Sequence, residues 1–290
     1  MPEFVQFLVS GLTVGAVYAL VALGFTLVYN ASDVVNFAQG EFVMLGGMVT
    51  VFLSVAGIPL PLAALLAVCV SIVVGLLLYW LAIEPAKDAS PVTLIIITIG
   101  ASILLRGIAQ IVFDKQFHKL PSISGDTPVH FLGAAVQPQS FWVIGGMAVI
   151  VLLLYVFLER TVLGKAVLAT AANKLAARLV GINTTTVMAL AFGGSAAIGA
   201  VAGVLITPIT LTSYDVGTML ALKGFAAAML GGMGNPIGAV AGGLLLGLLE
   251  AFGVGYISST YKDAFAFIVI LIVLFAAPQG LFGRRTVERV

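Results

Sequence analysis

Two ionisable residues, Glu41 and Lys223, stand at the openings of segments that are otherwise almost free of charge. Asn36 and Gln39 precede Glu41 and extend the polar stretch. Charges inside a membrane segment are costly and are read as functional by default. We expect Glu41 and Lys223 to pair and to contact a zwitterionic solute, whose carboxylate and ammonium need partners of opposite sign. The open alternative is that both lie at the lipid–water boundary and extend their charged ends into water.

An internal repeat connects these two regions. The word Met-Leu-Gly-Gly-Met occurs at 44–48 and again at 229–233, and Gly-Ala-Val occurs at 15–17 and again at 199–201. The nearly constant offset predicts a duplication whose copies run in opposite directions, an architecture common in transporters with the pathway between the repeats. Chance recurrence of short words in a biased composition is the alternative. The residues predicted to line the pathway are Asn36, Gln39, Glu41, Lys223, Gly231 and Gly232.

The segment 92–113 carries four polar residues at intervals of four, which places them on one face of a helix. They are Thr98, Ser102, Arg106 and Gln110. We predict that this face points into the protein as a buried hydrogen-bond network; a pathway wall is the alternative. Glu250, near the end of an apolar run, is interpreted as a residue at the membrane boundary.

Enzymatic and metal chemistry find no support. Gly164-Lys165 lacks the Ser or Thr and the earlier glycine of a phosphate-binding loop. Cys69 is the only cysteine, and His118 and His130 lack the spacing of a zinc helix. We therefore expect no catalytic residue, no cofactor and no metal site. The net charge of +1 also argues against nucleic acid as a partner.

Composition places the chain in a membrane. Of its 290 residues, 61% are hydrophobic and 9% are charged, with a mean hydropathy of +1.19, whereas a soluble domain carries roughly 25% charged residues. We predict one all-α integral membrane domain over 1–290, a helical bundle of about eight or nine spans with one or two broken helices. The candidate spans are 6–29, 37–56, 59–83, 92–113, 141–158, 184–206, 219–233, 236–255 and 263–282.

Small residues four apart let helices approach closely in lipid. The chain has four such glycine pairs, and the sequence does not tell whether they join helices within the chain or two subunits. The pairs are Gly11 with Gly15, Gly199 with Gly203, Gly238 with Gly242, and Gly243 with Gly247.

Lysine and arginine set the orientation, because cytoplasmic loops carry more of them. The loop 159–182 is the only long basic segment, and the C-terminal tail holds Arg284, Arg285 and Arg289. We predict that both are cytoplasmic. Counting spans backwards places the loop 114–140 and the N-terminus outside.

The residues 164–180 predict one amphipathic helix with Val167, Leu168, Ala171, Leu175 and Leu179 on a single stripe. Its alanines favour insertion into a groove on a soluble protein, and Gly181 is expected to end it. A basic helix lying on the anionic inner leaflet is the alternative.

The segment 169–182 (ATAANKLAARLVGI) resembles the coupling loop of branched-chain amino acid ABC-transporter permeases of the LivH type. The residues 35–42 and 222–238 resemble the same family, and the likeness extends from about residue 6 to Gly283. It implies that the coupling loop contacts an ATPase. The residues expected to make that contact are Lys165, Asn173, Ala176, Ala177, Arg178 and Gly181.

The resemblance further implies a bacterial inner-membrane protein with several partners: a second, LivM-like permease, two cytoplasmic ATPases and a periplasmic amino-acid-binding protein. The binding protein would dock on 114–140, for which an ordinary solvated connection is the alternative. We therefore predict the permease subunit of an ATP-driven importer for branched-chain or other hydrophobic amino acids, with amide or urea ligands left open. A stand-alone secondary transporter of a small zwitterionic or amide solute is the alternative, and a channel or structural protein has the least support.

Overall fold

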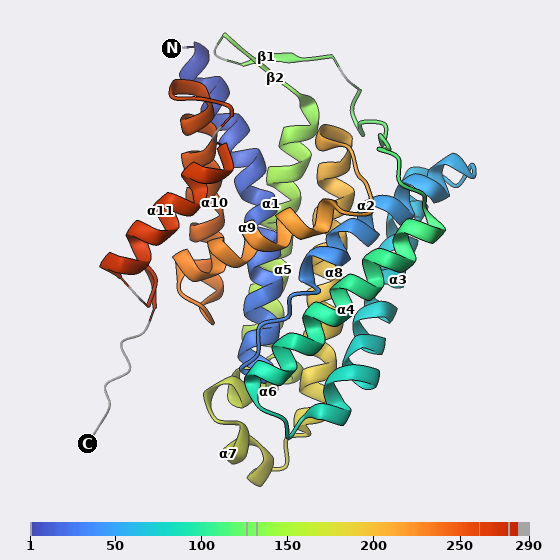
Figure 1. Ribbon diagram of the computed structural model, residues 1–290, viewed down its shortest axis with the longest axis vertical. Coiled ribbons are helices and arrows are strands. Elements are labelled where there is room, and N and C mark those ends of the chain that lie inside the picture. The colour runs from blue at the N-terminus through green and yellow to red at the C-terminus, as the bar shows by residue number, and fades with distance from the viewer. Residues whose placement is uncertain (1, 126, 132, 261, 278, 284–290) are drawn as a thin grey trace.

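The computed structural model describes residues 2–125, 127–131, 133–260, 262–277 and 279–283, and shows an elongated helical bundle (Figure 1). The N-terminus and the two short antiparallel strands β1 (Val129–Phe131) and β2 (Ala134–Val136) lie at one end. The helices α6 (Val162–Ala172) and α7 (Lys174–Leu179) lie at the other. We call these the β-hairpin end and the α6–α7 end. The arginines of the C-terminal tail lie outside the described residues.

Six helices of the described chain are long and apolar enough to cross a membrane. Three of them begin at an N-cap residue: the side chains of Ser90, Asn183 and Asn235 accept hydrogen bonds from backbone N–H groups in the first turn. The six are α1 (Pro2–Ser32), α3 (Leu60–Leu78, continued by η1, Tyr79–Ile83, and η2, Glu84–Ala86), α4 (Pro91–Val112), α5 (Pro138–Arg160), α8 (Thr184–Thr210) and α10 (Pro236–Tyr256).

The remaining predicted spans form shorter helices: α2 (Gln39–Val55), α9 (Val216–Gly231) and α11 (Lys262–Ala276). At 17 residues α2 is about 25 Å long, less than the roughly 30 Å of a bilayer core. The second and seventh predicted spans are thus both short helices, while eight or nine full crossings are not confirmed.

The glycine pairs join helices within the chain. Glycines of α1 face glycines of α10: a Cβ atom on Gly15 would lie 2.9 Å from the Cα of Leu244, and one on Gly247 would lie 2.3 Å from the Cα of Gly15. Gly203 of α8 approaches the Val43 carbonyl of α2 in the same way. These contacts hold α1 and α8 at the centre, where most of their residues are buried.

The two candidate repeat units run in opposite directions. In Figure 1, α1 descends from the β-hairpin end, whereas α8 rises from the α6–α7 end. The short helices α2 and α9 touch near their first residues, because a Cβ atom on Gly40 would lie 2.0 Å from the carbonyl oxygen of Gly217. An inverted repeat requires this antiparallel course, and the repeat itself stays a prediction.

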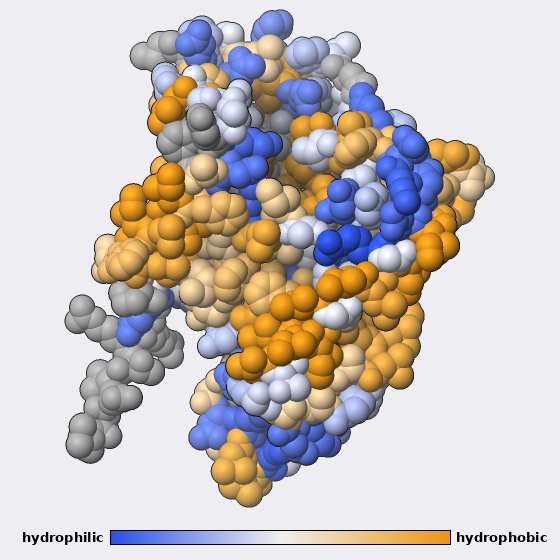
Figure 2. Space-filling model, viewed as in Figure 1, coloured by the Kyte–Doolittle hydropathy of each residue, from blue (hydrophilic) through white to orange (hydrophobic). Residues whose placement is uncertain are grey.

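Hydrophobic surface covers the middle of the molecule, and hydrophilic surface gathers at both ends (Figure 2). The helices α3, α4 and α5 expose many large apolar side chains, Leu65, Ile103 and Leu152 among them. Surface of this kind is stable in lipid and unfavourable in water. The chain is a multi-pass membrane protein.

Candidate functional site

The predicted pathway residues around the start of α2 are buried. Residues 33–38 are not helical, and α2 begins at Gln39. The Gln39 amide donates to the Ser195 carbonyl oxygen at 3.1 Å and accepts from the Ser195 hydroxyl. The Asn36 side chain accepts from the backbone N–H of Ala38 at 3.1 Å. Asn36 and Gln39 are fully buried and fix the start of α2 against its neighbours.

Glu41 pairs with Arg106 of α4, so the predicted pair with Lys223 is wrong. The Glu41 Oε1 atom accepts from the Ser102 hydroxyl at 2.8 Å and from Arg106 Nη2 at 3.2 Å. The Glu41 side chain is 1% exposed and that of Arg106 is 29% exposed. Thr98 of the same face accepts from the backbone N–H of Phe37 at 3.1 Å. The expected buried network on α4 is confirmed for Thr98 and Ser102, whereas Arg106 is only partly buried.

Lys223 belongs to a second ionic cluster on other helices. Its ammonium lies 2.8 Å from Glu250 Oε1 and 2.6 Å from Asp263 Oδ1. The Tyr18 hydroxyl donates to Glu250 Oε2 at 2.8 Å. Because Glu250 is only 7% exposed, its interpretation as a boundary residue is wrong. The rule applied to Glu41, that an acid inside an apolar run is functional by default, would have singled it out.

Gly231 is the last residue of α9, and Gly232 begins the connection to α10. Gly232 has φ of +100°, which favours glycine. A Cβ atom on Gly231 would lie 1.9 Å from the carbonyl oxygen of Gly238. Both glycines therefore permit a tight turn between two helices. They lie apart from the polar residues that were predicted to line the pathway with them.

The coupling segment consists of two helices, so the single helix predicted over 164–180 is wrong. Asn173 is extended at φ −163° and its side chain accepts from the backbone N–H of Ala176 at 2.9 Å, so it caps α7. Gly181, at φ +89°, ends α7 as predicted. The N–H of Ile182 bonds the Ala177 carbonyl and that of Gly181 bonds the Arg178 carbonyl, which is a Schellman motif.

The break between α6 and α7 divides the apolar stripe that was expected on a single helix. Val167 is buried, whereas Leu175 and Leu179 of α7 are 69% and 81% exposed. Ala176 is also exposed, but Ala177 is 3% exposed and packs inward. The prediction that Ala177 contacts an ATPase is thus wrong, because its side chain packs inside the protein. The exposed surface of α7 and its C-cap consists of Leu175, Ala176, Leu179 and Val180 with Arg178.

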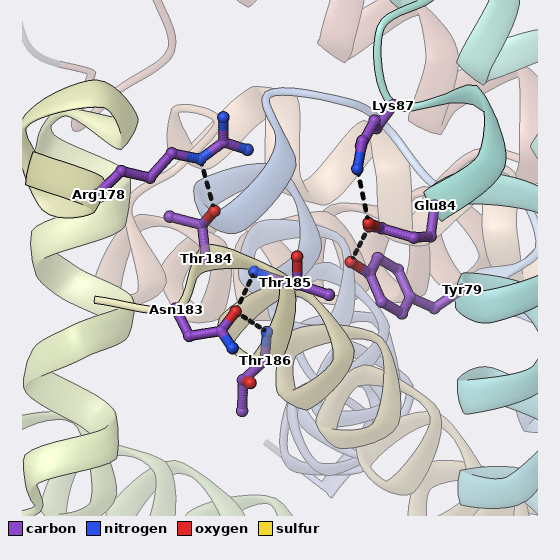
Figure 3. Close-up of polar contacts among 8 residues, drawn as sticks. All are labelled: Tyr79, Glu84, Lys87, Arg178, Asn183, Thr184, Thr185 and Thr186. Atoms are coloured by element: carbon purple, nitrogen blue, oxygen red, sulfur yellow. Dashed lines mark hydrogen bonds and ion pairs between the residues drawn. The ribbon is translucent and has the colours of Figure 1, made fainter. Parts of the chain in front are cut away.

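The loop after η1 and η2 lies beside α7 (Figure 3). The Arg178 Nε atom donates to the Thr184 hydroxyl at 2.8 Å, and Thr184 is the first residue of α8. Across the same opening, Lys87 lies 3.1 Å from Glu84 Oε1, and the Tyr79 hydroxyl donates to Glu84. This polar cavity of about 400 Å³ is lined by Lys87, Asp88, Arg178, Gly181, Ile182, Asn183, Thr184 and Thr185.

Known proteins resemble this chain from end to end. Residues 7–274 match the family described as the permease component of branched-chain amino acid transport systems. The high-affinity branched-chain amino acid permease protein BraD of Pseudomonas aeruginosa is 34% identical over 100% of both chains. The chain belongs to this permease family. LivH of Escherichia coli K12 is 34% identical over 99% of this chain and 98% of its own. A probable LivH of Methanocaldococcus jannaschii is 30% identical, covering 91% and 88%.

In this member of the branched-chain amino acid permease family, the polar residues described above lie in three separate clusters. The first is Asn36, Gln39 and Glu41 at the start of α2. The second is Lys223 of α9 with Glu250 of α10, and the third is Arg178 of α7 with Thr184 of α8. Among the described residues there is no group of three or more His, Cys, Asp and Glu that would hold a metal ion.

Proposed function

We propose that this chain is the membrane permease subunit of a binding-protein-dependent ABC importer for branched-chain or other hydrophobic amino acids. Relatives whose names carry that activity match the chain over its whole length. In this proposal the chain performs no covalent chemistry. Two cytoplasmic ATPases bind it, a second, LivM-like permease completes the pathway, and a periplasmic binding protein delivers the ligand.

The proposed orientation places the α6–α7 end in the cytoplasm of a bacterial inner membrane. That end carries Arg160, Lys165, Lys174 and Arg178, and Lys87 lines the cavity beside α7. Cytoplasmic loops are enriched in such residues. The β-hairpin end, which includes 114–140, then faces the periplasm and docks the binding protein.

The apolar surface of α7 is the single observation that carries the proposal. Leu179 and Val180 are 81% and 77% exposed at a hydrophilic end of the molecule. Exposed apolar side chains on a short helix that is capped at both ends are suited to a groove on a partner protein. The Arg178–Thr184 hydrogen bond connects this helix to α8.

That connection suggests how ATP moves the spans. The helix α8 packs along α2, where Gly46 is in backbone contact with Ala200. Displacement of α7 by closing ATPases would therefore shift α8 and the helix α2 that packs along it. The helix α9, which touches α2, would move with them. Alternating access between the two proposed inverted repeats follows from such a shift.

The test compares the same substitution at the two ends. Ala176→Glu places a charge on the exposed α7 surface and should abolish both co-purification of the ATPases and leucine uptake. Ala135→Glu, at an exposed residue of the β-hairpin end, should leave ATPase binding intact. Recovery of the unmodified chain alone, transporting in liposomes on an ion gradient, would instead establish a secondary transporter.

A further inference from the structure

A cavity of about 360 Å³ lies beside the Lys223–Glu250 cluster. Its walls come from α1, α8, α9, α10, the residues just before α9 and the first residue of α11, together with the exposed Phe117. The volume falls within the roughly 300–1,000 Å³ of small-molecule sites. The cavity therefore joins segments from both proposed repeats and from the last two helices.

The lining combines charge of both signs with aliphatic surface. Lys223 and Glu250 are 5% and 7% exposed and form the more buried side, with the Tyr18 hydroxyl bonded to Glu250. Asp215 and Lys262, both exposed, also line the cavity. Most of the remaining wall is apolar, contributed by valine, isoleucine, leucine and methionine side chains of α1, α8 and α9, with Thr210 and Ser213 beside them.

We infer that this cavity is a transient binding site for a zwitterionic amino acid with an apolar side chain. The inference rests on the proposed function and identifies where substrate meets this subunit. The ammonium of Lys223 would bind the substrate carboxylate, and the carboxylate of Glu250 would bind the substrate ammonium. The aliphatic wall would take the side chain.

The arrangement of charges explains how such a site can both bind and release an amino acid. Lys223 is shared between two carboxylates, Glu250 and Asp263. A zwitterion exchanges the internal pair for two external pairs, so no buried charge is left without a partner at either stage. A ligand without an ammonium leaves Glu250 with no cationic partner, whereas a ligand without a carboxylate leaves Lys223 paired with Asp263. Recognition should thus require the ammonium and be strengthened by the carboxylate.

Protection of a thiol tests the inference in the complete transporter without nucleotide. Met219 lines the cavity and is 46% exposed. We would introduce Met219→Cys in a Cys69→Ser background and measure the rate of maleimide labelling. Leucine at about ten times its dissociation constant should slow labelling by about tenfold, because only the unoccupied fraction reacts. A thiol introduced by Val129→Cys on β1 should label at the same rate with and without leucine.

Two analogues of leucine test the recognition of each charged group. We expect no protection by 4-methylpentanoate, which lacks the ammonium and leaves Glu250 unmatched, and weaker protection than by leucine from 3-methylbutylamine, which lacks the carboxylate, at the same concentration. Glu250→Gln should remove the protection by leucine. Glu159→Gln, which makes the same change at an exposed acid of α5 outside the cavity, should keep it. Equal protection by 4-methylpentanoate, or none by leucine, overturns the inference whether or not Glu250→Gln assembles.

The same preparation separates this inference from the proposed function. Leucine uptake with the binding protein and ATPases present, but without protection at Met219→Cys, would overturn the binding site alone. Absence of both uptake and ATPase binding would overturn the proposed function itself.

Discussion

Among the residues that the structure describes, two acids are buried, and each lies beside a base on a different helix. Glu41 of α2 is bonded to Arg106 of α4, and Glu250 of α10 is bonded to Lys223 of α9. The sequence shows that each acid needs a partner, because an isolated charge in an apolar segment is costly. It does not show which base, because that depends on the depth and rotation of helices far apart in the chain.

Double-mutant cycles should reproduce this pairing. Glu41→Gln combined with Arg106→Gln should show a coupling energy of about 0.5–3 kcal/mol, because the two side chains share one hydrogen-bond network. Glu41→Gln combined with Lys223→Gln should be additive to within about 0.5 kcal/mol, as for independent sites. The measurement is the free energy of unfolding in detergent. Coupling in the second cycle and additivity in the first would contradict the arrangement.

At the scale of the elements, the predicted spans correspond to helices because apolar runs of this length have few other stable forms in lipid. The sequence predicted the polar face of α4 from the four-residue spacing of its polar residues. It predicted the end of α7 at Gly181 because glycine readily adopts a positive φ. The break at Asn173 did not, because its neighbours all favour a helix. Only the cap geometry, with Asn173 accepting from Ala176, reveals it.

Close backbone contact between α1 and α10 predicts a sharp difference between two glycines. Gly247→Ala places a Cβ atom 2.3 Å from the Cα of Gly15 and should destabilise the protein by about 1–3 kcal/mol, as overpacked cores do. Gly107→Ala on α4 meets nothing within 4 Å and should be neutral or stabilising, since alanine favours helix. Thermal denaturation in detergent measures both. Equal midpoints for the two variants would show that α1 and α10 are not in contact.

At the scale of the whole molecule, charge and shape together predict the orientation in the membrane. The α6–α7 end carries the longest basic segment, and the N-terminus and 114–140 share the opposite end. Single cysteines replacing Ala176 and Ala135 in a Cys69→Ser background therefore lie on opposite sides of the bilayer. A membrane-impermeant maleimide should label Ala135→Cys in intact spheroplasts and Ala176→Cys in inside-out vesicles.

The reverse pattern would place α7 in the periplasm, out of reach of any ATPase, and labelling of both residues from one side would contradict the arrangement of the spans. The prediction thus tests the fold and the direction of coupling together, because α7 can transmit ATP-driven motion to α8 only from the cytoplasm.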